Sequence, residues 1–268
     1  MTEFQSALDH VHATLSELRE QGVELRASAA ALTRLASTPT VAKPVPAPLP
    51  GPPPVFTIPV GSKAARLAAL RGPVLACTLC PHLVKSRTQV VFGVGNPEAE
   101  LMFVGEAPGE DEDLQGEPFV GKAGQLLTKI IVAMGFTRDD VYIGNVLKCR
   151  PDMPPGEPGN RKPKPAEMET CLPYLRQQID IIQPRALVAL GATAMTGLLG
   201  ADEPMGKLRG RWHDFHGIPL MATYHPAYLL RNQSLTEKRK VWEDMLLVLA
   251  HLGNPISEKQ RGFFLTKG

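Results

Sequence analysis

Short apolar runs and helical segments alternate through the middle of the chain, and this alternation restricts the fold more than any other feature. Four runs are rich in Val, Ile and aromatic residues, as is typical of buried strands; they cover residues 99–105, 140–147, 185–191 and 218–225. Helical candidates lie at residues 121–134, 165–182, 192–199 and 234–252. The pattern predicts an α/β fold, a three-layer αβα sandwich around a central four-stranded parallel sheet.

The residues before position 61 differ from this region. Apolar residues recur at three- and four-residue steps over residues 4–35, with an interruption at Gly22, which predicts one amphipathic helix. Such a helix docks a partner, pairs with itself, packs on its own body or stays loose. Residues 38–60 are rich in Pro, a composition that favours an extended linker. We predict four parts: an arm (1–37), a linker (38–60), a globular domain (61–252) and a C-terminal tail (253–268).

Charge and hydropathy exclude several classes of protein. Lys plus Arg total 29 against 27 for Asp plus Glu, so net charge does not single out a nucleic-acid binder, although a local basic patch remains compatible. The N-terminus lacks the pattern of a secretory signal, and no apolar stretch is long enough to span a bilayer. We therefore expect a soluble, cytoplasmic protein. In a reducing compartment its four cysteines point to metal ligation rather than to disulfides.

The cysteine spacing is informative. Cys77 and Cys80 form a C-x-x-C pair, whereas Cys149 and Cys171 come singly from the core region. Four thiolates suit either a tetrahedral zinc ion or an iron–sulfur cubane. A zinc ribbon normally uses two close pairs, so the spacing favours a cluster that clips the segment before the sheet onto the domain. In the alternative interpretation, some of these residues are ordinary buried cysteines.

Three distinctive segments follow predicted strands. "GEAPGEDED" begins at Gly105, Asn145 stands near the end of the second strand, and "YHPAYLLR" begins at Tyr224. Ligands of parallel sheets bind beyond the carboxyl ends of the strands, so these segments should form one cleft. Glycines in the first segment let backbone approach a flat ligand closely. A phosphate-binding P-loop would need Ser or Thr after its Lys, and "GKAG" has neither.

Together these segments resemble a known family. "GEAPGEDED…GEPFVGKAGQLL", "NVLKCRP", "NRKPKPAEMETC" and "TYHPAYLLR", behind the C-x-x-C pair, resemble the family 4 uracil-DNA glycosylases, the iron–sulfur branch of the uracil-DNA glycosylase superfamily. The resemblance covers about residues 76–249, in the same order. It implies the fold of that superfamily and a structural 4Fe–4S cluster bound by Cys77, Cys80, Cys149 and Cys171.

The resemblance also implies an activity and partners. Such an enzyme flips uracil out of single- or double-stranded DNA and hydrolyses its N-glycosidic bond, which leaves an abasic site for base excision repair. We expect a monomer whose N-terminal arm is a candidate binding site for a repair partner. A related branch captures the sugar covalently through a His in an inserted loop. This chain has no His between Cys149 and Cys171, so we expect turnover by hydrolysis.

Catalytic roles follow from the charge that develops in the reaction. The sugar becomes positive and the departing uracil negative, as in other glycosides that break through an oxocarbenium-like state. The resemblance assigns Glu106 to position the attacking water and steady the sugar cation. It assigns His225 to donate a ring N–H to a uracil carbonyl oxygen. Ala107 stands where the better-known branch has Asp, so the general-base role passes to Glu106 or to backbone carbonyls.

Base recognition is carried over in the same way. The amide of Asn145 donates and accepts together, which matches the uracil edge and not the cytosine edge. Phe119 is the implied stacking platform, and Glu112 is expected near uracil C5, where it would exclude the thymine methyl group. Ala107 completes the predicted substrate-binding set.

Two groups are predicted to contact DNA. Apolar wedges and a cation that enter the minor groove follow the catalytic His, namely Leu229, Leu230 and Arg231. A basic loop for the phosphate backbone surrounds the last two cysteines and holds Lys148, Arg150, Arg161, Lys162 and Lys164. We expect the cluster to hold this loop against DNA.

The sequence leaves three alternative functions open. The same fold could act on other deaminated bases, such as hypoxanthine or xanthine. The chain could instead be an iron–sulfur DNA-binding or redox-sensing module without catalysis. A third alternative, the related N-terminal segment of phage-type polymerases, would need a polymerase domain. The presence of Glu106, Phe119, Asn145 and His225 argues for an active enzyme.

Overall fold

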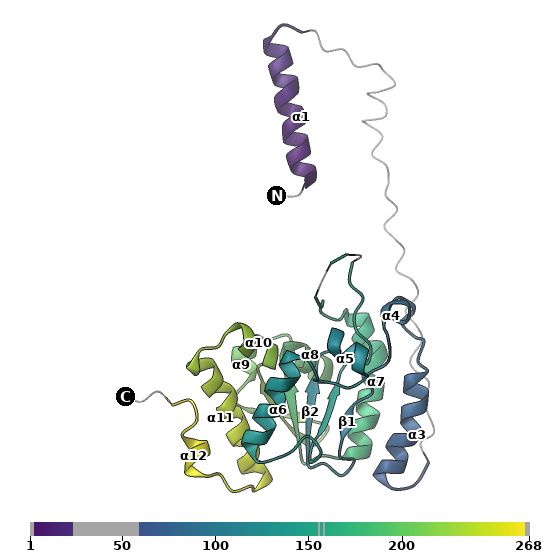
Figure 1. The fold of residues 1–268 in the computed structure, drawn as a ribbon, viewed down its shortest axis with the longest axis vertical. Coiled ribbons are helices and arrows are strands. Elements are labelled where there is room, and N and C mark those ends of the chain that lie inside the picture. Colours follow the sequence, from purple (N-terminus) through teal and green to yellow (C-terminus); the bar gives the residue numbers. More distant parts are fainter. Residues whose placement is uncertain (1–2, 24–58, 155, 158, 266–268) are drawn as a thin grey trace. The chain divides into compact units, whose positions relative to one another are not determined.

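The computed structural model describes residues 3–23 and 59–265, apart from residues 155 and 158 (Figure 1). The chain divides into two compact units, residues 1–48 and 49–268. In the first unit, α1 spans Glu3–Glu20 and ends just before Gly22, whose φ of 76° no longer fits a right-handed helix. The predicted helix is thus present up to this glycine. Its predicted continuation to residue 35, and the predicted linker up to residue 58, lie outside the described residues.

The second unit is built on a six-stranded sheet with the order β1-β3-β2-β4-β6-β5. Its four central strands pair in parallel, which confirms the predicted sheet. They are β2 (Leu101–Gly105), β3 (Tyr142–Asn145), β4 (Ala186–Leu190) and β6 (Ile218–Thr223).

Two antiparallel edge strands were not predicted: β1 (Val94–Gly95) and β5 (Trp212–Phe215). The first is only two residues long, and "WHDF" of the second is too polar for an apolar run. A two-residue turn joins β5 to β6, and its residues His216 and Gly217 both have positive φ, the conformation that suits a tight hairpin. The dipeptide His-Gly between two short runs was the available signal.

Helices cover both faces of the sheet (Figure 1). Met102 and Val104 of β2 point to one hydrophobic cluster, and Leu101 and Phe103 point to the other, because successive strand residues face opposite sides. The first cluster packs against α3 (Lys63–Leu75), α7 (Pro165–Ile182) and α8 (Ala192–Leu199), and the second against α6 (Lys122–Met134) and α11 (Leu235–Leu252). The three-layer αβα prediction is confirmed.

Shorter helices lie in the connections. They are α4 (Pro81–Ser86), α5 (Glu110–Gln115), α9 (Met205–Leu208), α10 (Pro226–Arg231) and α12 (Glu258–Arg261). Residues after 252, predicted as a tail, pack on the domain: the Trp242 indole donates to the Gln260 carbonyl at 2.6 Å, and its ring centroid lies 5.2 Å from that of Phe263. Within the described ranges, no helix has the length and apolar character that crossing a membrane requires.

Candidate functional site

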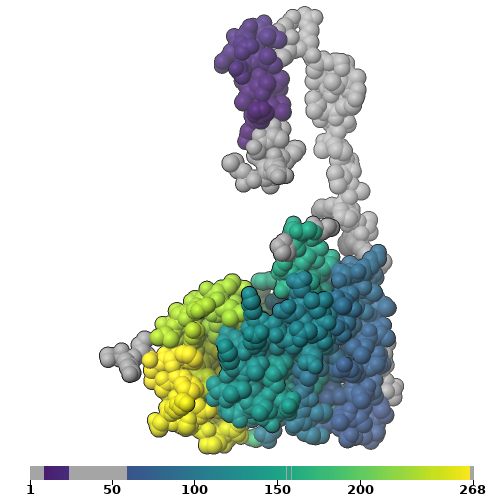
Figure 2. All heavy atoms as spheres, viewed as in Figure 1, coloured from purple at the N-terminus to yellow at the C-terminus, as the bar shows by residue number. Residues whose placement is uncertain are grey.

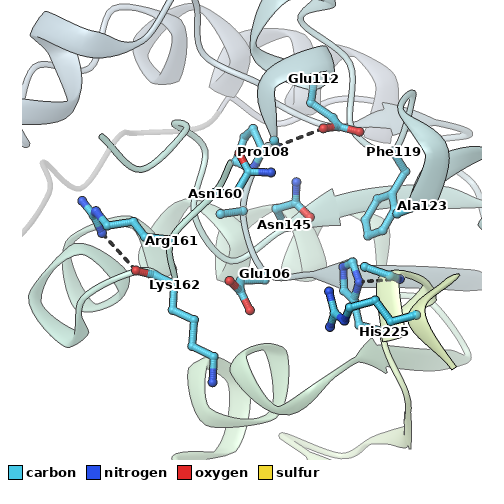
Figure 3. Close-up of a pocket in the computed structure, with 14 residues that line it drawn as sticks. Glu106, Pro108, Glu112, Phe119, Ala123, Asn145, Asn160, Arg161, Lys162 and His225 are labelled. Carbon is cyan, nitrogen blue, oxygen red and sulfur yellow. Dashed lines mark hydrogen bonds between the residues drawn. The ribbon is translucent and has the colours of Figure 1, made fainter. Parts of the chain in front are cut away.

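The carboxyl ends of β2, β3 and β6 meet at one edge of the sheet and border a cavity of about 390 Å³. Gly105 ends β2 and pairs in register with Asn145, which ends β3. His225 lies two residues beyond the end of β6. The cavity brings together all the predicted catalytic and base-binding residues, Glu106, Ala107, Glu112, Phe119, Asn145 and His225 (Figure 3). Figure 2 shows the teal and lime segments that supply them, and the green segment between these in the chain, around a recess.

Asn145 lies at the inner end of the cavity, with 2% of its surface exposed. Its Oδ1 is buried and has no hydrogen-bond partner within the described ranges. Gly105 leaves the necessary space beside it, because a Cβ at that position would collide with Oδ1 of Asn145 and with the ring of Phe119. Leaving a buried acceptor unpaired costs about 1–3 kcal/mol. The arrangement therefore fits a flat ligand that brings an N–H to Asn145.

Phe119 forms one side of this slot. Its φ of 55° is unusual for a bulky residue and marks a backbone held by its surroundings. The guanidinium of Arg138 donates to the carbonyl of Phe119 at 3.2 Å and to that of Pro118 at 2.9 Å. Gly124 of α6 packs so closely on the Phe119 backbone that a Cβ there would collide with it. The ring is therefore fixed, with its centroid 5.6 Å from that of His225 and the two planes 31° apart.

His225 is the N-cap of α10, and this position determines its tautomer. Its Nδ1 accepts a hydrogen bond from the Ala227 N–H at 3.1 Å (Figure 3). A neutral imidazole that accepts at Nδ1 carries its proton on Nε2. Burial, with a smaller contribution from the charge of Arg231, lowers the pKa of His225 to about 4. At neutral pH the ring is uncharged and presents one fixed N–H donor.

Glu106 and Ala107 follow β2 directly. The backbone carbonyl of Glu106 accepts from the Leu147 N–H at 3.0 Å, so this carbonyl is already engaged. The Glu106 carboxylate lines the cavity and makes no hydrogen bond or ion pair with any residue that the structure describes. Ala107 offers only a methyl group. The Glu106 carboxylate is thus available to bind water, and the choice of general base stays a prediction.

Glu112 of α5 organises the loop around the cavity. One carboxylate oxygen accepts from the N–H groups of Val120 and Gly121, and the other accepts from the Gly109 N–H, all at 3.0 Å. These bonds fix the carboxylate at the rim of the cavity and tie the loop after β2 to the start of α6. Its predicted contact with uracil C5 stays a prediction.

The predicted DNA contacts on α10 need one correction. Leu230 and Arg231 are exposed, and Arg231 lines the cavity. Leu229 is only 4% exposed, because successive residues of a helix point in different directions and this one faces the interior of the domain. The wedge role assigned to Leu229 does not agree with this burial.

The predicted basic loop needs a second correction. Lys148 is 1% exposed, and its ammonium donates to the side-chain oxygen of Gln178. Burial lowers its pKa to about 8. Lys148 lies inside the domain because it directly follows the buried segment after β3, so the prediction that it contacts phosphate is wrong. Lys162 and Lys164 are exposed, whereas Arg150 and Arg161 bond to neighbouring protein groups.

The four cysteines lie near one another beside this loop. Their thiols raise one another's pKa: that of Cys80 rises to about 11, first through burial and then through the proximity of Cys149 and Cys77. Sulfur atoms accept hydrogen bonds from Arg87 (to Cys149, 3.1 Å), the Lys148 N–H (to Cys171, 3.2 Å) and the Tyr174 hydroxyl (to Cys77, 3.4 Å).

The sulfur spacing helps to choose between the candidate metal groups. Zinc–sulfur bonds of about 2.3 Å in a tetrahedron would place the sulfurs about 3.8 Å apart. Among the described residues, no three cysteine sulfurs lie within 4.8 Å of one another. The donor set therefore fits a thiolate-bound group larger than one zinc ion.

Several site residues were missed by sequence reasoning. Asn160 lines the cavity, and Arg138 fixes Phe119. Asp244 of α11 is fully buried, accepts from the Thr223 hydroxyl at 2.6 Å and pairs with Arg209 at 2.8 Å, which anchors the end of β6 before His225. These contacts join residues far apart in the chain, so no local pattern could have indicated them.

The chain is similar in sequence to a known superfamily of proteins. The sequence model of the uracil-DNA glycosylase superfamily matches residues 92–246. The chain is similar to a Type-4 uracil-DNA glycosylase of Thermotoga maritima, with 48% identity over 175 residues that cover 64% of this chain and 87% of the relative. A Type-4 enzyme of Archaeoglobus fulgidus is 42% identical (62% and 83% covered), and a Type-5 uracil-DNA glycosylase of Pyrobaculum aerophilum is 32% identical (57% and 79% covered).

Proposed function

The chain belongs to the uracil-DNA glycosylase superfamily, within its Type-4 family, and from this premise we propose that it excises uracil from DNA by hydrolysis. The observation that carries the proposal is the buried Oδ1 of Asn145, which has no hydrogen-bond partner among the described residues and ends a slot bordered by Phe119 and His225. The product is an abasic site, the substrate of later steps of base excision repair.

Asn145 supplies the recognition of the base. The uracil N3–H donates to Oδ1, and the neighbouring uracil carbonyl accepts from the amide NH₂. Cytosine presents an acceptor at N3 and a donor beside it, which would leave buried groups unpaired and disfavour its binding. Phe119 stacks on the base. The immobilised carboxylate of Glu112 at the rim lies beside C5, where it excludes a methyl group.

His225 and Glu106 act on opposite sides of the bond that breaks. As the C1′–N bond cleaves, its electron pair leaves with uracil, and the Nε2–H of His225 donates to a uracil carbonyl oxygen that gains negative charge. The Glu106 carboxylate stabilises the sugar cation and orients the water that adds to C1′. The proton of that water passes to Glu106. Ala107 contributes only its methyl group to the wall of the site.

Cys77, Cys80, Cys149 and Cys171 are assigned to hold a structural 4Fe–4S cluster. Their mutual proximity, their spacing and the three hydrogen bonds to sulfur support this assignment. When bound, the group would tie the segment between α3 and α4, the segment after β3, and α7 to one another. These cysteines would then fix the chain around the cavity.

The DNA strand is assigned to the mouth of the cavity. Leu230 and Arg231 of α10 enter the gap in the base stack that the flipped nucleotide leaves. The exposed Lys162 and Lys164 contact phosphates of single- or double-stranded DNA. We propose further that the protein acts as a monomer, with its N-terminal arm as the candidate binding site for a repair partner.

The proposal is tested with end-labelled oligonucleotides that carry one uracil, hypoxanthine, xanthine, thymine or cytosine. Iron-loaded protein should produce an alkali-labile site at uracil and none at thymine or cytosine. Asn145→Asp should lose uracil release, because a carboxylate cannot donate to the uracil carbonyl. Preferred cleavage at hypoxanthine or xanthine would favour a different base preference. DNA binding without cleavage of any base would mean that the fold serves as a binding module.

A further inference from the structure

A buried carboxylate connects the cysteine site to the cavity. Glu167 of α7 is 2% exposed and accepts four hydrogen bonds. Two come from the guanidinium of Arg161 at 2.7 and 2.9 Å, one from the Lys164 N–H at 2.7 Å and one from the His82 ring at 2.7 Å. Arg161 also pairs with Asp152. These contacts are called here the Glu167 clasp, comprising His82, Asp152, Arg161, Lys164 and Glu167.

The clasp lies next to the cysteine ligands in the chain. His82 comes two residues after Cys80, Asp152 comes three after Cys149, and Glu167 comes one helical turn before Cys171. It therefore joins the segments that carry three of the four cysteines. On its other side, Arg161 stands between Asn160 and Lys162, and all three line the cavity. Figure 3 shows this loop on the side of the cavity opposite Phe119 and His225.

The loop between the third and fourth cysteines needs such a contact. Its described residues from 150 to 164 form neither helix nor strand, so side-chain bonds determine its course. Burial would by itself raise the pKa of Glu167, but the hydrogen bonds from Arg161, Lys164 and His82 outweigh it and hold this pKa at about 2. The carboxylate is charged at neutral pH, and breaking a buried pair of this kind is strongly destabilising locally.

We propose that Glu167 and Arg161 are positioning residues whose ion pair holds the Asn160–Lys162 wall in place, and thereby sets the affinity for DNA. This inference rests on the proposed function. It reassigns Arg161, which pairs internally and so does not contact phosphate itself. Asn145, His225 and Glu106 stand at strand ends and are independent of the clasp. Loss of the clasp should therefore change KM and leave the chemical step nearly unchanged.

The test compares Glu167→Gln, Arg161→Met and the double variant with Glu169→Gln, an exposed residue on the same helix. Each clasp variant should raise KM for uracil-containing DNA about tenfold, with kcat within about threefold of wild type. The KM of the double variant should be no higher than that of the more impaired single variant, because both substitutions remove the same ion pair. Glu169→Gln should behave as wild type. Iron content and visible absorption establish that the cluster is retained.

Salt dependence separates positioning from direct phosphate contact. A direct contact would make the salt slope of DNA binding about one unit shallower in Arg161→Met, whereas Glu167→Gln would free the guanidinium and leave binding unchanged or tighter. The proposal expects the same slope in Glu167→Gln as in Arg161→Met, because both variants release the wall that carries Lys162. Additive effects, a shallower slope confined to Arg161→Met, or a wild-type KM in Glu167→Gln would overturn it.

A third clasp variant and hydrogen exchange provide two further tests. If Glu167→Gln loses iron, the comparison passes to His82→Ala, because His82 is partly exposed and contributes one bond. This variant should raise KM by a smaller factor, and an unchanged KM would then overturn the proposal. Hydrogen exchange of residues 150–164 should be faster in Glu167→Gln than in wild type. That readout requires no activity, so it distinguishes failure of the clasp from failure of the proposed function.

Discussion

The two walls of the cavity are built differently. One wall carries Gly105, Asn145 and His225 at or just beyond the ends of parallel strands, where sheet register and buried packing fix their positions. The other wall carries Asn160–Lys162 on a loop whose described residues form neither helix nor strand and depend on ion pairs. Residues assigned to the chemistry occupy the first wall, and residues near the DNA backbone occupy the second. Groups that need sub-ångström placement thus stand at positions fixed by the sheet and its packing.

The largest expected effect comes from removing the N–H donor of His225 on the first wall, which is called the strand-borne wall because strand ends carry it. His225→Ala should lower kcat by about 10²–10³, the typical cost of losing one donor to a developing anion. It should also destabilise the fold by about 1 kcal/mol, because α10 loses its N-cap. His225→Ser is the matched control, since Ser restores a cap acceptor but does not reach the base. The two variants should lose activity equally, but His225→Ser should melt at a higher temperature than His225→Ala. Recovery of activity in His225→Ser would show that His225 acts through the helix cap.

A smaller but still large effect should follow from crowding the same wall. Gly105→Ala places a Cβ against Oδ1 of Asn145 and the ring of Phe119, and neither can retreat because both are buried. Displacement of this slot should reduce kcat/KM by about a hundredfold. Gly72→Ala is the control, since that helical glycine faces open space and the change should stabilise α3 slightly. A fully active Gly105→Ala would show that the slot is deformable.

An intermediate effect is expected where the cysteine site meets the sheet. Lys148 has no carboxylate partner in the part of the chain that the structure describes, and the groups that favour its ammonium form are Cys171 and Cys149 as thiolates. Lys148→Met should therefore weaken iron retention about tenfold and lower the reduction potential of the bound group. Iron release to a chelator and voltammetry measure these changes. The exposed Lys85→Met should alter neither; unchanged values in Lys148→Met would mean that this lysine serves packing alone.

The contrast between the walls also explains what the sequence could reveal. Apolar runs predicted all four central strands, and α7 and α8 were predicted with the same ends that the structure has. Because strand ends meet at one edge, the convergence of Asn145 and His225 followed from the pattern. The burial of side chains just after the strand ends did not follow: whether Lys148 or Leu229 faces inward depends on packing against residues distant in the chain. The bond from His82 to Glu167 spans 85 residues, which no local periodicity encodes.

The smallest expected effect concerns pH: the rate should not change where an ordinary histidine titrates. An ordinary histidine titrates near pH 6.5, but burial lowers the pKa of His225 to about 4, and its Nδ1 is occupied by the Ala227 N–H. Because the folded-state pKa lies below the ordinary value, the ring stays neutral as pH falls from 8 to 5, and protonation begins only near pH 4. The single-turnover rate on pre-bound DNA should therefore show no inflection near pH 6.5. An inflection there that disappears in His225→Ser would mean that the imidazole titrates during catalysis, and that the strand-borne wall is less shielded from water than its packing indicates.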